Sequence, residues 1–291
     1  MKPGYFALVV IAIITTQLTV IYFIYYRSII MKIFSLPKGN PKEYIEKLNE
    51  NSSSNSNKKR IVFIGDSITH GNMSVNFIDI IAKELGKDHF DYINGGLNAS
   101  LAYNVLQRLP DIIECRPDIA IILIGTNDAH RSIQLYKPGI TNRRIHLPRV
   151  PDKEWFIENL EHIVLELQHK TDAKVVLCSI PPIGEDTTHE IFKLCIEFSN
   201  IIKEISDEMN IHYLPVNEKL TEFLSLNPSK PKYPTDKKLY GLAAAWHYFI
   251  DLELDQISKN YGFSLLIDNL HLNSKGAKII AELVIDFIRA N

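Results

Sequence analysis

Three residues whose side chains could together carry out acyl transfer stand far apart in this sequence. Ser67 follows the apolar run 61–64 and ends the tripeptide Gly-Asp-Ser, whereas Asp268 and His271 lie three residues apart far downstream. A serine hydroxyl becomes a strong nucleophile when a base removes its proton, and a carboxylate can orient that base. If the fold brings them together, these side chains predict serine-based acyl transfer.

The segments between them alternate between short strands and amphipathic helices. Nearly all-apolar runs, typical of parallel strands buried on both faces, occupy 61–65, 90–94, 119–125, 174–179 and 211–215. Helical periodicity covers 75–85, 101–113, 155–169, 191–209 and 275–290. This alternation, with right-handed crossovers, predicts an α/β fold that forms a three-layer α/β/α sandwich.

Two further polar motifs follow strands on the same expected edge of the sheet. The block 94–99 follows the second strand, and Gly125-Thr126-Asn127-Asp128 follows the third. Ligands of open parallel sheets bind beyond the carboxyl ends of the strands. The motifs around Ser67, 94–99, Asn127 and His271 are therefore expected to meet at one rim, although they are distant in sequence.

Taken in order, these four motifs resemble the four sequence blocks of the SGNH (GDSL) hydrolase family. The resemblance covers residues 61–287 and leaves out the apolar amino-terminal segment. It implies a flavodoxin-like fold with a five-stranded parallel sheet. It also implies a serine esterase, lipase or acyl-transfer activity that requires neither a metal nor another cofactor.

The resemblance also implies a role for each motif residue. Ser67 would be the nucleophile, His271 the base that takes its proton, and Asp268 the carboxylate that fixes the imidazole. Neutral imidazole is available near pH 7, because its unperturbed pKa is about 6.5. The oxyanion of the tetrahedral intermediate would receive hydrogen bonds from the Ser67 backbone N–H, the N–H of the second block and the Asn127 side chain.

The second block departs from the family pattern at Ala99, where the family usually has glycine. An alanine still donates its N–H, so Ala99 remains the expected oxyanion donor of this block. If the position requires a positive φ, however, its Cβ strains the backbone. Asp66 is expected to be a structural hydrogen-bond partner and Asp128 to orient the loop of Asn127. His70 and His130 are expected to lie at the surface or in a pocket wall.

The amino terminus does not belong to the predicted α/β domain. Residues 5–26 carry no charge and lie between Lys2 and Arg27. About 20 apolar residues span a bilayer, and Tyr and Phe near both ends suit its interfaces. The run has no small-x-small cleavage site at its end, which disfavours a signal peptide. We expect a retained single-pass transmembrane helix over 1–30. A buried core helix fits less well, because the run has no polar stripe.

Three further segments follow from this division. Residues 31–60, with the Ser/Asn-rich stretch 52–57, are expected to be a polar tether, and 61–291 to be the hydrolase domain. Within that domain, 226–263 has no strand run but an aromatic cluster, which fits either a lid or extra core packing.

The sequence leaves two alternatives for the side of the membrane on which the hydrolase domain lies. Basic residues after the apolar run favour a cytoplasmic domain, whereas the short amino-terminal tail favours export.

Composition restricts the classes of partner. The chain has 291 residues, 46% of them hydrophobic, and a formal net charge of −2. It therefore has no overall positive potential that would attract nucleic acid. Its three cysteines show no Cys-x-x-Cys spacing, which argues against a zinc site or a disulfide framework. We expect an ester substrate and a membrane as partners and no metal. The oligomeric state cannot be predicted.

Three functions remain after these steps. The first is a membrane-anchored serine hydrolase that cleaves a carboxylic ester, either a lipid acyl ester or an O-acetyl group on a glycan. The second is an acyltransferase with a sugar or lipid acceptor, since the same three side chains serve both reactions. The third, a non-catalytic binding domain on a membrane stalk, is disfavoured because Ser67, Asn127, Asp268 and His271 are all present.

Overall fold

Five parallel strands form the centre of residues 36–291 in the computed structural model, which describes residues 3–50, 57–133 and 147–291. They are β1 (Lys59–Gly65), β2 (Phe90–Gly96), β3 (Ile119–Leu123), β4 (Lys174–Cys178) and β5 (His212–Leu214). Their order, β2-β1-β3-β4-β5, is that of the flavodoxin-like fold, whose ligands bind where β1 and β3 diverge. The predicted fold class is confirmed.

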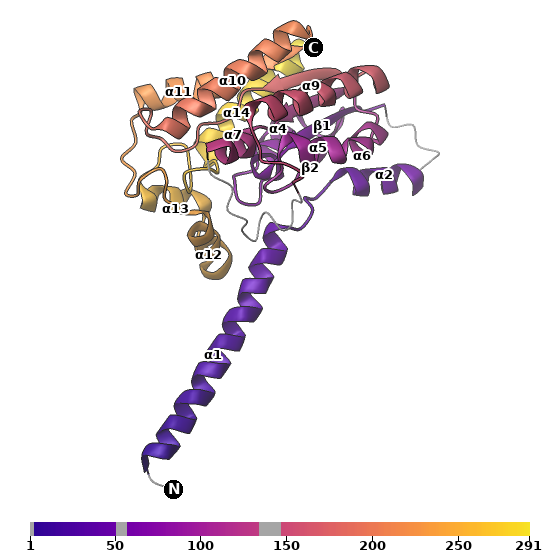
Figure 1. The fold of residues 1–291 in the computed structure, drawn as a ribbon. Coiled ribbons are helices and arrows are strands. Elements are labelled where there is room, and N and C mark those ends of the chain that lie inside the picture. The colour runs from indigo at the N-terminus through magenta and orange to yellow at the C-terminus, as the bar shows by residue number, and fades with distance from the viewer. Residues whose placement is uncertain (1–2, 51–56, 134–146) are drawn as a thin grey trace. The chain divides into compact units, whose positions relative to one another are not determined.

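Helices cover both faces of this sheet (Figure 1). One face carries α4 (Phe77–Leu85), α11 (Val216–Leu226) and α14 (Ser274–Ala290). The other carries α5 (Ala102–Gln107), α6 (Leu109–Glu114), α9 (Lys153–Lys170) and α10 (Glu190–Glu208). Two short helices, α3 (Ser67–His70) and α7 (Thr126–Ile133), begin at the carboxyl ends of β1 and β3.

Each strand supplies side chains to two hydrophobic clusters. In β1, Ile61 and Phe63 belong to the cluster on the α4 face, and Val62 and Ile64 to that on the α9 face. Because both faces are buried, the strands are uninterrupted apolar runs in the sequence.

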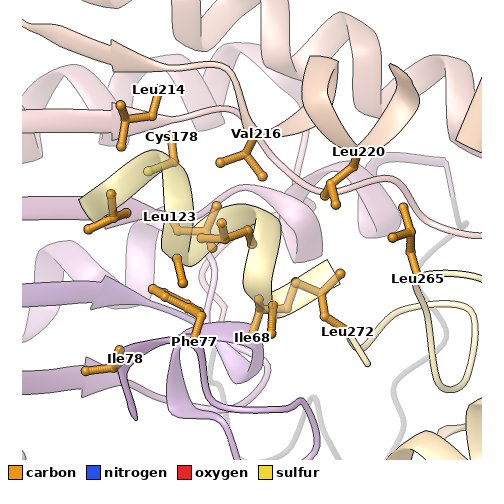
Figure 2. Packing of buried hydrophobic residues seen from close by; sticks show 14 of the residues in the cluster. Ile68, Phe77, Ile78, Leu123, Cys178, Leu214, Val216, Leu220, Leu265 and Leu272 are labelled. Atoms are coloured by element: carbon orange, nitrogen blue, oxygen red, sulfur yellow. The ribbon is translucent and has the colours of Figure 1, made fainter. Parts of the chain in front are cut away.

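Figure 2 shows part of the cluster on the α4 face, which we call the first cluster. Leu123 and Cys178, both from strands, lie among side chains from helices, including Phe77 and Val216. Ile68 joins the same cluster from α3, one residue after Ser67. The turn that carries Ser67 is thereby fastened to the hydrophobic core.

The single helix predicted over 101–113 is two helices, α5 and α6, because Pro110 has no N–H to donate to the Leu106 carbonyl. Arg108, between them, directs its guanidinium inward. Nη2 donates to the carbonyl of Gly65 over 2.8 Å, and Nη1 donates to that of Gly95. The break therefore places a half-buried cation against the carboxyl ends of β1 and β2.

The segment expected to be a polar tether, 31–60, is partly helical. In α2 (Pro41–Glu50), Pro41 is buried, and Tyr44 and Ile45 pack against the second cluster, the one on the α9 face. The Tyr44 hydroxyl also donates to Asp91 over 3.1 Å. The difference arises because these side chains give a short segment an apolar face to bury. Most of the Ser/Asn-rich stretch 52–57 lies outside the described residues, because these omit 51–56.

Residues 1–35 form a separate unit whose described part is the helix α1 (Pro3–Ile33). Its segment Val10–Ile33, 24 residues, is long and apolar enough to cross a membrane, although a signal sequence would meet the same criterion. The helix extends beyond the predicted boundary at residue 30.

The segment 226–263 contains two helices, α12 (Tyr240–Ile250) and α13 (Leu254–Tyr261). Ala243 of α12 and Ile257 of α13 are buried in the first cluster, whereas Leu242 and Trp246 are exposed. One side of this segment thus packs on the core, and the other side is exposed.

Candidate active site

Ser67 lies where β1 ends and α3 begins. Asp66 caps the helix, because its Oδ1 accepts the N–H of Ile68 over 3.0 Å. Gly65 is required by close packing, since a Cβ there would lie 2.4 Å from the carbonyl oxygen of Leu123 on β3. The tripeptide therefore forms a tight strand-to-helix turn that holds Ser67 at the carboxyl edge of the sheet.

The structure brings Ser67, His271 and Asp268 together. His271 Nε2 lies 3.0 Å from Ser67 Oγ, and its Nδ1 lies 2.8 Å from Asp268 Oδ2. Asp268 Oδ1 accepts the backbone N–H of Leu270 over 3.1 Å and that of His271 over 2.9 Å. Asp268 thus holds both the ring and the backbone of the histidine, and this fixes the direction in which Nε2 points.

Burial and charge act in opposite directions on His271. Burial alone lowers its pKa, but the charge and hydrogen bond of Asp268, with a further contribution from Asp66, outweigh burial. The net result is a pKa raised above the ordinary value of 6.5. Such an environment stabilises the imidazolium that forms when the ring accepts a proton.

The loop that carries Asp268 and His271 is closed on itself. Leu266 and Leu272 form an antiparallel bridge, and the Ile267 N–H donates to the His271 carbonyl over 2.7 Å. After the loop, Asn273 caps α14 by accepting the first free N–H groups of that helix. The position of the imidazole is therefore set by a short, internally bonded loop.

Sequence reasoning misses Glu185, which anchors the start of this loop. Its carboxylate accepts the backbone N–H groups of Ser264, Leu265 and Leu266 over 2.8, 2.7 and 2.7 Å. The residue is only 7% exposed, so these three bonds are shielded from water. No motif marks Glu185, and the only available signal is its place shortly after the carboxyl end of β4.

Asn127, in the first turn of α7, lies beside the serine turn. Its side-chain Nδ2 donates to Asp66 Oδ2 over 3.0 Å and to the Ser100 carbonyl over 3.1 Å. These two bonds account for both protons of the amide. Asn127 is thus fixed between the ends of β1 and β2, with its donors already engaged.

Ala99 occupies the third position of a tight turn over 97–100. The Ser100 N–H donates to the Leu97 carbonyl over 3.2 Å, and Ala99 has a φ of +64°. A positive φ at the third position is the signature of a type II turn, which favours glycine. The departure from glycine therefore falls at a position where Cβ is strained. Within the described residues, the Ala99 N–H makes no hydrogen bond.

Comparison with known families decides the identity of the fold. The model of the GDSL-like lipase/acylhydrolase family matches residues 63–279, a span that includes Ser67, Ala99, Asn127, Asp268 and His271. The chain belongs to this family. It is accordingly an ester-hydrolysing enzyme. No curated protein matches the sequence.

Solved structures of two acetyl xylan esterases and of another hydrolase share this fold. The acetyl xylan esterase AlAXEase matches 79% of this chain and 99% of its own, with a TM-score of 0.58 and 19% identity. Axe2, an acetylxylan esterase from Geobacillus stearothermophilus, matches 80% of this chain and 96% of its own, with a TM-score of 0.54 and 18% identity. LAE5, an α/β hydrolase from the metagenome of Lake Arreo, Spain, matches 78% of this chain and 94% of its own, with a TM-score of 0.55 and 14% identity. At such identities the likeness concerns the fold.

Two buried carboxyl groups support the motif loops of this GDSL-like protein. Burial raises the pKa of Asp66 to about 6 and that of Asp128 to about 7. Asp66 bonds Asn127 and the Ile68 N–H, and Asp128 accepts the Ala102 N–H at the start of α5 over 3.2 Å. The two carboxyl groups therefore hold the loops after β1, β2 and β3 to one another.

A cavity of about 150 Å³ lies beside Asp268 and is also lined by His130, Lys238 and Tyr240. His130 is thus a pocket-wall residue. Burial, together with the nearby charges of Lys238 and Arg131, lowers the pKa of His130 to about 4. Ser67 and His271 do not line this cavity. The cavity therefore lies on the Asp268 side of the candidate site and not on the Ser67 side. His70 lies buried in α3.

Proposed function

We propose that this GDSL-like protein is a membrane-anchored serine esterase with Ser67, His271 and Asp268 as its catalytic triad. The observation that carries the proposal is the unbroken chain of contacts from Ser67 Oγ through the imidazole to Asp268, at 3.0 and 2.8 Å. Hydrogen-bond reach between nucleophile, base and orienting carboxylate is the geometric requirement for this chemistry.

In the proposed reaction, Ser67 Oγ forms a bond to the ester carbonyl carbon while its proton passes to His271 Nε2. The tetrahedral intermediate then breaks its bond to the alcohol oxygen, which takes the proton from His271 and leaves. Water attacks the acyl group on Ser67 in the same manner. Its proton passes through His271 back to the Ser67 oxygen as the carboxylic acid departs.

Three donors would bind the oxyanion in this mechanism. The Ser67 N–H is at the first position of α3, where backbone N–H groups have no partner within the helix. The Ala99 N–H is unused within the described residues. Asn127 would have to share with the oxyanion the proton that it donates to the Ser100 carbonyl.

The proposed anchor is α1, which supplies the required length and apolar character. The proposed substrate is a carboxylic ester, either a lipid acyl ester or an O-acetyl group on a glycan. Likeness to acetyl xylan esterases supports the second class. A panel of p-nitrophenyl esters from acetate to palmitate separates the two by acyl length, and product analysis with an added alcohol acceptor tests for acyl transfer.

Labelling with a fluorophosphonate probe tests the nucleophile. We expect the wild-type enzyme to be labelled at one site and Ser67→Ala to be neither labelled nor active, with an unchanged melting temperature. Ser225→Ala, at an exposed position of α11, is the matched control and should behave as wild type. Turnover near the wild-type rate in folded Ser67→Ala would disprove the triad.

A further inference from the structure

Helix α12 carries an apolar stripe on its outer side. Leu242, Trp246 and Ile250 are 46%, 41% and 61% exposed, and Phe249 is 41% exposed. Residues spaced by three, four, seven and eight positions share one face of a helix. The outer face of α12 is thus apolar over its whole length. Large exposed apolar side chains are otherwise scattered singly over the described part of residues 36–291.

The charge pattern sets α12 apart from an ordinary surface helix. Its eleven residues include no Asp, Glu, Lys or Arg. Ala243 and Ala244, on the inner side, are buried. A helix that is apolar on the outside and held to the core on the inside is typical of an interface with a partner or with lipid.

Hydrogen bonds connect α12 to the loops of the active site. The Tyr248 hydroxyl donates to the backbone carbonyl of Asn72 over 2.8 Å, just after α3. The side chain of Asn72 in turn accepts a hydrogen bond from Asn98 over 3.0 Å, next to Ala99. These bonds join α12, through Asn72, to the loops that follow Ser67 and that carry the proposed oxyanion donor. Figure 1 shows α12 projecting from the domain beside α13.

The length of the chain after α1 indicates which partner is within reach. Two residues, Phe34 and Ser35, lie between Ile33, the end of α1, and Leu36, the start of the domain, so the connection spans at most about 11 Å. With α1 as the anchor of the proposed function, the start of the domain stays within about 20 Å of the bilayer surface, because residues 27–33 add roughly 10 Å of helix to this connection. Trp and Phe beside Leu and Ile are the residues that helices lying in the lipid–water interface present to the membrane.

A second copy of the chain fits this face less well. Four side chains with these exposures present on the order of 400 Å², about half of what each partner buries in a standard protein interface. The flanking charges are of both signs, with Lys237 and Lys238 before the helix and Asp251 and Glu253 after it. Mixed charge suits zwitterionic headgroups and predicts contact that depends little on salt.

We propose that α12 lies in the lipid–water interface of the membrane that holds α1, with Leu242, Trp246 and Ile250 inserted at the acyl boundary. This inference rests on the proposed function, because it takes α1 to be a membrane anchor. It adds a second contact, which fixes the orientation of the domain so that the loops around Ser67 are next to the bilayer surface.

The two tryptophans of the chain allow a direct test. Trp246 lies in the stripe, and Trp155 is only 7% exposed. The full chain is reconstituted into phosphatidylcholine vesicles with and without bromine on the acyl chains, and tryptophan emission is measured. In Trp155→Phe, which retains Trp246, we expect bromine to quench at least half of the emission. In Trp246→Phe, which retains Trp155, we expect little quenching.

A matched pair of charge substitutions tests the face itself. Leu242→Glu on the stripe should abolish most quenching of Trp246, whereas Leu165→Glu, 42% exposed on α9 and across the sheet, should leave it unchanged. Both are made in the Trp155→Phe background. Equal effects of the two substitutions would overturn the assignment to this face.

Flotation of the same samples separates this inference from the proposed anchor. If the chain floats with the vesicles but Trp246 is not quenched, the anchor stands and the interfacial helix is wrong. If the chain does not float and Trp246 is not quenched, both are wrong. In a third outcome, Trp246 is quenched, and the chain stays on the vesicles in high salt but is removed by alkaline extraction. This outcome would support the interfacial position of α12 and contradict the spanning anchor.

Discussion

The side-chain amide of Asn127 donates to the carboxylate of Asp66 over 3.0 Å, so the residue before the proposed nucleophile holds the residue proposed as an oxyanion donor. The second amide proton bonds the Ser100 carbonyl, next to Ala99. One side chain thus connects the loops after β1, β2 and β3. The three proposed donors are therefore positioned together by a single buried network.

Removing this amide should affect the chemical step more than binding. We expect Asn127→Ala to lower kcat by about 10²–10³, the usual loss for one oxyanion donor, with a small change in KM. Removing the donor to Asp66 Oδ2 and to the Ser100 carbonyl should also cost about 1–3 kcal/mol of stability, measured by denaturation. A change confined to KM would instead assign Asn127 to substrate binding.

Replacing Ala99 should relieve the strain of its left-handed backbone. An L-residue with Cβ pays about 1–2 kcal/mol there, whereas glycine adds about 0.4–1 kcal/mol of unfolded-state entropy. We therefore expect Ala99→Gly to be equally or slightly more stable, with kcat unchanged or modestly raised. Ala245→Gly, at a helical position of α12, is the control and should lose about 1 kcal/mol. A large fall of kcat in folded Ala99→Gly would mean that the methyl group shapes the pocket and that the oxyanion amide belongs to another residue.

The raised pKa of His271 determines the acid side of the pH profile. The base must be neutral, so kcat/KM should fall as the pH drops through a value above 6.5. Asp268→Asn removes the main charge that raises this pKa, so it should shift the acid limb of the kcat/KM profile to lower pH. Asp66→Asn should shift the acid limb by less. A wild-type limb centred below pH 6 would contradict the assigned base.

The same shift has the opposite sign for stability. Because the folded pKa of His271 exceeds the unfolded value, protonation stabilises the fold. This contribution is fully present below about pH 6.5 and is lost as the pH rises through the folded pKa. Activity and this part of the stability should therefore change in opposite directions over that interval.

Glu185 is expected to position the loop of the acid and base without touching substrate. Glutamine keeps one acceptor oxygen, so Glu185→Gln should break the bond to at least one of the three backbone N–H groups. We expect slower fluorophosphonate labelling of Ser67 and a lower melting temperature, with the pH limb of His271 retained. Glu190→Gln, at an exposed position of α10, is the matched control. Labelling at the wild-type rate in Glu185→Gln would limit Glu185 to a role in stability.

The strands and the motif residues could be predicted because each leaves a pattern in the sequence. Both faces of β1 are buried, so its residues form one apolar run, and the motifs follow the strands at fixed places. Arg108 and Glu185 leave no such pattern, since their partners are backbone groups that only the tertiary fold brings near. Side chain–backbone bonds of this kind are independent of the partner's residue type.

For a related reason, the sequence did not distinguish a lid from extra core packing in the aromatic segment 226–263. The alanines of α12 are small enough for close packing, and its large residues would suit a core equally well. Which face of a wholly uncharged helix is buried depends on what the rest of the chain places beside it. The fold puts Ala243 inward and Leu242 outward.

The separation of 204 residues between Ser67 and His271 orders events during synthesis. At about 5–20 residues per second, a ribosome needs roughly 10–40 s to pass from one to the other. Throughout that interval the proposed nucleophile exists without its proposed base. With α1 as the proposed anchor, the growing chain would reach the membrane while still inert, because the proposed triad is complete only after the segment with Asp268 and His271 has docked against the finished sheet.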